Sequence, residues 1–79
     1  MYLVQLLVFN EGSGAIYSDS SLWPSLDEAK KEYNHIIMFY KDYDIVSEHE
    51  NKISLQQSSE EIVIQLSEIT FKEIKRISL

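Results

Sequence analysis

Apolar side chains occupy both alternating faces of residues 2–9, YLVQLLVF, where Gln5 is the one interruption. A run rich in valine and leucine, without glycine or proline, is typical of a central strand that is covered on both sides. The next stretch, NEGSG, contains both glycines of the chain and favours a turn. The segment AIYSD then predicts the returning strand of a hairpin.

Over residues 25–40 the apolar positions recur with the 3.6-residue period of a helix. Ser25 and Glu28 form an S-x-x-E capping box at its start. The pattern predicts an amphipathic helix with Tyr33 at the centre of its buried face. The apolar residues on that face are Leu26, Ala29, Tyr33, Ile36, Ile37 and Tyr40.

The remainder of the chain alternates with the shorter period of strands. The stretches IVSEHE, KISLQQ and EEIVIQL predict three short strands, separated by turns at EN and SSE. The clean alternation in EEIVIQL indicates one buried face. Residues 69–79 contain a second capping box, Thr70 with Glu73, and predict a short C-terminal helix or a further strand.

This order of elements, ββ-α-βββ, predicts a single small α+β domain over residues 1–79. Its simplest packing is an antiparallel sheet with one amphipathic helix on it. One helix covers only one face of a sheet, whereas the first strand is apolar on both faces. We therefore expect the second face to be covered by the C-terminal segment or by a second copy of the chain, which leaves a homodimer open.

Charge narrows the range of partners. The chain has 13 acidic residues and 7 lysines and arginines, a net charge of −6. Nucleic-acid binders gain affinity from clustered lysine and arginine, so direct nucleic-acid binding is not expected. An acidic surface suits a basic protein partner instead. The absence of cysteine fits the cytoplasm, and the apolar runs are too short to span a membrane.

No group of residues meets the requirements of a catalytic or metal site. Glu32 and His35 have the E-x-x-H spacing of carboxylate metal proteins, but the motif occurs once and is expected on the solvent side of the helix. His49 lies between two glutamates, although neighbours in a strand point to opposite faces. The GSG stretch lacks the ending of a phosphate loop. We expect no catalytic residue, no metal and no cofactor, and predict that the protein is not an enzyme.

The acidic stretch KDYDIVSEHE is the first candidate for partner binding. Alternate residues of a strand point the same way. The residues expected on one face are Asp44, Val46, Glu48 and Glu50, with Asp42 just before the strand. These carboxylates would meet lysines and arginines of a basic protein. The alternative is that they only protect a sheet edge against aggregation.

Two aromatic residues complete the candidate binding surface. Phe39 falls away from the apolar stripe of the helix, so it is either an exposed hot spot or folded under a loop. Trp23 precedes Pro24, which favours an extended entry to the helix. The sequence favours Trp23 as a core plug at the end of the helix over an exposed anchor.

In general build the chain resembles the small acidic inhibitors of phages and mobile elements, such as anti-CRISPR and other anti-defence proteins, and small immunity proteins that neutralise a toxin. The residues that carry this resemblance are YLVQLLVFNEGSGAIYSD, SLDEAKKEY and KDYDIVSEHE. The resemblance implies binding to a host or toxin protein, sometimes at its nucleic-acid-binding surface. It carries over no site residues.

We therefore expect a stoichiometric protein-binding module, an inhibitor that engages a basic surface of its partner. Two alternatives stay open at this point. One is an oligomeric protein that binds or sequesters a small molecule, and the other is an accessory subunit of a larger complex.

Overall fold

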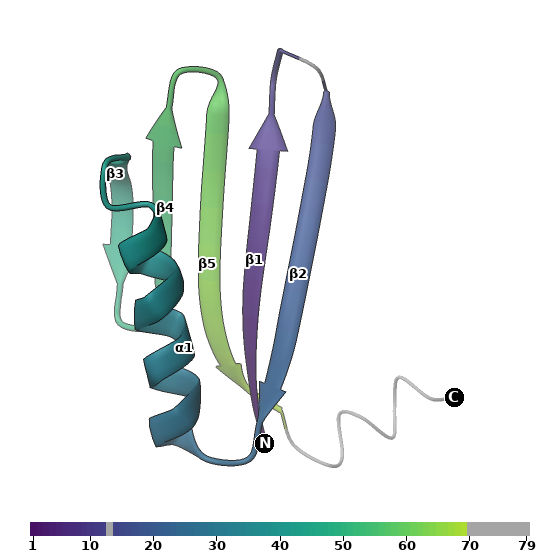
Figure 1. Ribbon diagram of the computed structural model, residues 1–79, viewed down its shortest axis with the longest axis vertical. Coiled ribbons are helices and arrows are strands. Elements are labelled where there is room, and N and C mark those ends of the chain that lie inside the picture. The colour runs from purple at the N-terminus through teal and green to yellow at the C-terminus, as the bar shows by residue number, and fades with distance from the viewer. Residues whose placement is uncertain (13, 70–79) are drawn as a thin grey trace.

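Five antiparallel strands form one sheet, and a single helix packs on it in the computed structural model, which describes residues 1–12 and 14–69 (Figure 1). The strand order is β2-β1-β5-β4-β3. The predicted α+β class and the order ββ-α-βββ are confirmed, while the predicted C-terminal helix or strand falls on residues 70–79, outside the described residues. The elements are β1 (Tyr2–Asn10), β2 (Ala15–Trp23), α1 (Leu26–Phe39), β3 (Asp44–His49), β4 (Lys52–Gln57) and β5 (Glu60–Glu68).

The helix joins the two edges of the sheet, because it follows β2 and precedes β3. Its predicted capping box is confirmed in its first half, because the Glu28 backbone N–H donates to Ser25 Oγ at 3.3 Å. The Glu28 carboxylate accepts from the Ser25 hydroxyl at 3.2 Å, where the capping box predicts a bond from the Ser25 backbone N–H. The helix starts at the end of the sheet where β2 and β5 finish (Figure 1). This placement lays α1 against β5, β1 and β2.

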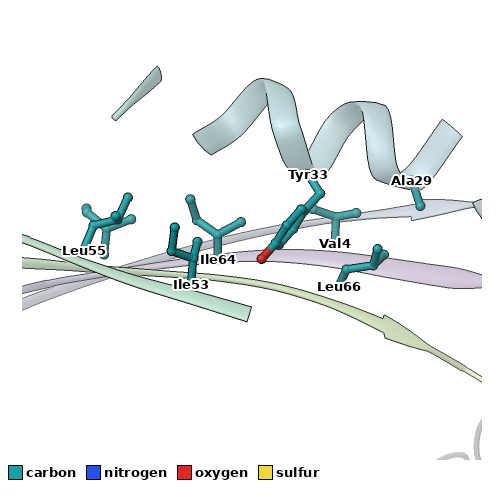
Figure 2. Close-up of a cluster of buried hydrophobic side chains, with 8 residues drawn as sticks. Val4, Ala29, Tyr33, Ile53, Leu55, Ile64 and Leu66 are labelled. Atoms are coloured by element: carbon teal, nitrogen blue, oxygen red, sulfur yellow. The ribbon is translucent and has the colours of Figure 1, made fainter. Parts of the chain in front are cut away.

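Between the helix and the sheet lies the hydrophobic core. Ala29 and Tyr33 point from α1 toward the sheet (Figure 2). The predicted central position of Tyr33 is confirmed, since its side chain is buried, and burial is the main cause of a raised pKa for its phenol. The sheet residues of the core are Val4, Ile53, Leu55, Ile62, Ile64 and Leu66.

The opposite face of the sheet is apolar along β1 but carries no helix within the described part of the chain. Leu3, Leu7 and Phe9 of β1 are partly exposed, and in the register Leu3 lies beside Leu22 of β2 and Leu7 beside Val63 of β5. We call this set, Leu3, Leu7, Phe9, Leu22 and Val63, the bare face. Coverage of the bare face by residues 70–79 or by a second copy stays a prediction.

Candidate functional site

A groove runs along the outer flank of α1, between the helix and strands β1 and β2, on the helix side of the sheet. Its largest hollow has a volume of about 350 Å³ and lies beside Trp23. Two smaller hollows share lining residues with it and with each other, so the three adjoin along the same flank of the helix. The residues lining it include Leu6, Asp19, Ser21, Trp23, Glu28, Lys31, Glu32, His35, Ile36, Phe39 and Tyr40.

Helical spacing places four side chains of α1 along this groove. Glu28, Glu32, His35 and Phe39 are separated by four, three and four residues, which keeps them on one side of the helix. The sequence predicted that Glu32 and His35 face solvent, and it left open whether Phe39 is exposed or folded under a loop. In the structure this side of the helix forms one wall of the groove, because Trp23 of β2 lies opposite it at one end and Leu6 of β1 toward the other.

Trp23 closes one end of the groove. It packs against the core and also presents part of its ring at the surface, so it combines the two roles considered from the sequence, core plug and exposed anchor. Its indole is partly buried and packs against the core, and its Nε1–H donates to Ser21 Oγ at 2.8 Å. This hydrogen bond joins two side chains on the same face of β2 and fixes the orientation of the ring. The favoured interpretation as a core plug is therefore correct only in part, because the same ring also lines the largest hollow.

Phe39 lies toward the other end of the groove and is 79% exposed. Its ring is 6.0 Å from that of Tyr40, centroid to centroid, in a tilted arrangement. The alternative that Phe39 folds under a loop is wrong, since so little of its surface is covered. Met38, the residue before it, is 66% exposed but does not line the groove.

The charged side chains that line the groove are mainly acidic. Asp19, Glu28 and Glu32 contribute three carboxylates, and Lys31 contributes the one ammonium group. Apolar side chains such as Leu6 and Ile36 lie between them. Carboxylates beside an indole ring attract cationic groups, through charge and through the ring face. The groove is therefore suited chemically to lysine or arginine side chains with apolar neighbours.

The acidic residues of β3 lie at the opposite edge of the sheet from this groove. Asp42, Asp44, Glu48 and Glu50 are all exposed. The prediction that Asp44, Glu48 and Glu50 share one face of the strand is wrong. A bulge between Ile45 and Ser47 shifts the register of the strand.

The bulge separates the acids of β3 onto two faces. Asp44 pairs with Gln56, whereas Glu48 pairs with the buried Ile53 and so lies on the helix side. The nearby charge of Glu48 is the second cause, after burial, of the raised pKa of Tyr33. Glu50 lies in the turn after the strand. The candidate residues thus form two groups, Trp23 and Phe39 at the groove and the four acids at the far edge.

A cluster of tyrosines holds the end of the helix on the sheet. The Tyr43 hydroxyl donates to Glu60 Oε1 at 2.6 Å, and this hydrogen bond is the main cause that raises the pKa of Tyr43 to about 12. The ring of Tyr40 meets that of Tyr43 edge to face, with 5.2 Å between centroids. Tyr43 and Glu60 do not line the groove, so their hydrogen bond is structural, whereas Tyr40 belongs both to this cluster and to the groove lining.

Within the described residues, no three histidine, cysteine or acidic side chains gather closely enough to hold a metal ion. Glu32 and His35 line the same hollow. No helix among the described elements is long and apolar enough to cross a membrane.

Sequence reasoning missed the polar residues that complete the groove, above all Asp19, Glu28 and Glu32. The spacing of Glu28, Glu32 and Phe39 was visible in the sequence, but the position of the second strand beside this side of the helix was not. No protein-family model matches the chain, and comparisons with curated proteins and with solved structures find no match.

Proposed function

We propose that the protein is a stoichiometric binding module, an inhibitor of the anti-defence or immunity type, that engages a basic surface of a partner protein. The observation that supports this proposal is the groove itself, where two aromatic rings, the partly exposed Trp23 and the largely exposed Phe39, flank three carboxylates. Exposed aromatic side chains commonly dominate binding energy at interfaces, and the surrounding charges select the partner.

The two groups of candidate residues have different roles in this proposal. The groove anchors the partner, because it offers apolar and aromatic surface together with carboxylates. The exposed acids of β3 and the adjoining turns, Asp42, Asp44, Glu48 and Glu50, contribute to the negative field that attracts a basic protein. Charges of this kind chiefly raise the association rate and make it depend on salt.

The proposal is tested by capture of a partner from the native host with tagged protein, using matched variants of two adjacent residues. Phe39→Ala removes an exposed ring that lines the groove, whereas Met38→Ala removes an exposed side chain that does not. We expect one basic protein to be captured by the wild type and by Met38→Ala, and to be lost with Phe39→Ala.

Kinetics then test the role of the acidic residues. The double variant Glu48→Lys with Glu50→Lys is expected to slow association with the captured partner and to flatten its salt dependence, with an unchanged circular dichroism spectrum. Equal retention of the partner by Phe39→Ala and Met38→Ala would argue against the groove. An unaltered association rate would leave the β3 acids as edge protection alone.

A further inference from the structure

The two edge strands of the sheet are built differently. The β3 edge is six residues long, carries a bulge and is rich in acids. The β2 edge is nine residues long, and its pairing with β1 is unbroken from Ala15 to Trp23 (Figure 1). Short length, bulges and charge are the usual means of preventing an edge strand from pairing with another chain. The β3 edge has all three, while β2 has one charged residue, Asp19.

One hydrogen bond identifies the backbone groups of β2 that point outward. The Ser20 backbone N–H donates to Asp19 Oδ1 at 2.9 Å, so this N–H is directed away from the ladder with β1. In an antiparallel ladder the backbone groups of alternate residues point the same way. Ser18 and Leu22 therefore also present their N–H and C=O groups at the open edge.

The two sides of this edge offer different surroundings to the side chains of an added strand. On the helix side, alternate residues of β2 are Tyr17, Asp19, Ser21 and Trp23, and Glu28 and Glu32 lie across the groove. On the other side, Leu22 lies at the margin of the bare face. Because successive side chains of a strand point to opposite faces, charge complementarity selects basic residues on one side and apolar residues on the other.

We propose that β2 receives an extended segment of the partner protein as a sixth strand, with lysine or arginine at alternate positions facing the groove and apolar residues between them. Backbone hydrogen bonds supply affinity in this mode of binding, and the alternate side chains supply selectivity. The proposal rests on the proposed function and specifies how its basic partner is bound.

Synthetic peptides of nine residues, the length of β2, provide the test. The probe is a peptide of alternating lysine and valine. A second peptide has the same composition with its lysines and valines in two separate blocks, and a third alternates serine and valine. Trp23 is the sole tryptophan, so its fluorescence reports binding directly. Amide hydrogen exchange, followed by NMR, reports whether a strand has been added.

The alternating lysine peptide is expected to bind and to slow exchange of the Ser18, Ser20 and Leu22 amides by about tenfold or more. The block peptide and the serine peptide are expected to bind at least about tenfold more weakly. Ser20→Pro should abolish binding of the alternating peptide, because proline removes an outward N–H that β1 does not use. Ser20→Ala retains that N–H and should bind like the wild type.

Three results would overturn the proposal. Equal binding of the alternating and block peptides, without amide protection, would mean that the groove binds basic chains without strand addition, and the proposed function would stand. Self-association that is abolished by Ser20→Pro in the absence of peptide would identify a second copy as the occupant. Failure of the alternating peptide to protect the edge amides of the wild type decides against strand addition even if Ser20→Pro does not fold. The proposed function fails separately, if the wild type captures no basic protein from the native host.

Discussion

On the face of the sheet that carries α1, Ile62 and Ile64 of β5 are fully buried, whereas Leu3 and Leu7 on the other face of the adjacent strand β1 remain partly exposed. Both sets are large aliphatic side chains on interior strands of one sheet. They differ because the helix packs over only one of them. Apolar character in a strand thus indicates which positions can be buried, and the element packed against them decides which are.

The two faces also divide the roles of the molecule. The helix side has a buried core, and its margin beside β2 has the acidic and aromatic groove. The bare face has a stripe of leucine, phenylalanine and valine among polar residues, with no described element on it. Stability should therefore depend mainly on the first face, and the following predictions test that difference in order of expected effect.

The largest effect is expected from truncation of a leucine on each face. Leu66→Ala removes a side chain that is 5% exposed, next to Val4 in the register, and should lower the free energy of unfolding by about 3 kcal/mol. Leu7→Ala removes the same atoms from the bare face and should lower it by only about 1 kcal/mol. Urea unfolding of both variants measures the difference.

Equal losses of unfolding free energy in Leu66→Ala and Leu7→Ala would contradict the difference between the two faces. They would indicate that the bare face is covered in solution, by residues 70–79 or by a second copy. Light scattering of the wild type and of a chain ending at Ile69 then separates these occupants. A dimer that persists after the truncation identifies the second copy, whereas aggregation of the shortened chain identifies residues 70–79.

The helix and the order of elements were predictable because their signals are local. The N-cap at Ser25 and the apolar period through Tyr33 both lie within one segment, and the structure has both. The bulge in β3 left no such signal. It depends on how β3 pairs with β4, and its one extra residue, Val46, reverses the faces expected for the acids that follow.

Only part of the groove was predictable, because its other part depends on strand pairing rather than on a local signal. Trp23 and Phe39 could be recognised as unusual from the helix pattern and from their neighbours. Their position at one groove, together with Asp19, follows from the placement of β2 at the edge of the sheet. That placement is set by pairing of β1 with β5, whose segments are far apart in the sequence.

The helix cap tests how firmly α1 is held over its face. Ser25→Ala removes the acceptor of the Glu28 N–H and should reduce stability by about 1 kcal/mol. Ser25→Asp restores an acceptor at the same position and should recover most of the loss. Thermal or urea unfolding followed by circular dichroism measures both variants. A neutral Ser25→Ala variant would indicate that packing against the sheet alone fixes the start of the helix.

The smallest effect is expected at the other end of the helix, where Tyr43 binds Glu60. Tyr43→Phe removes that hydrogen bond and should reduce the free energy of unfolding by roughly 0.5–1 kcal/mol at neutral pH. The folded-state pKa of Tyr43, about 12, lies above the ordinary value of 10.0. The stability that this phenol contributes to the folded state is therefore fully present below pH 10 and is lost as the pH rises through 12.

Urea unfolding at pH 8 and at a series of values above pH 10 measures this dependence. The difference in stability between the wild type and Tyr43→Phe should shrink steadily across that interval, because ionisation of Tyr43 favours the unfolded chain. Tyr17→Phe is the matched control, since Tyr17 is 56% exposed and on the open part of the helix side. Equal stability of the wild type and Tyr43→Phe at pH 8 would mean that Tyr43 stabilises the helix end by its ring contact with Tyr40 rather than by its hydroxyl.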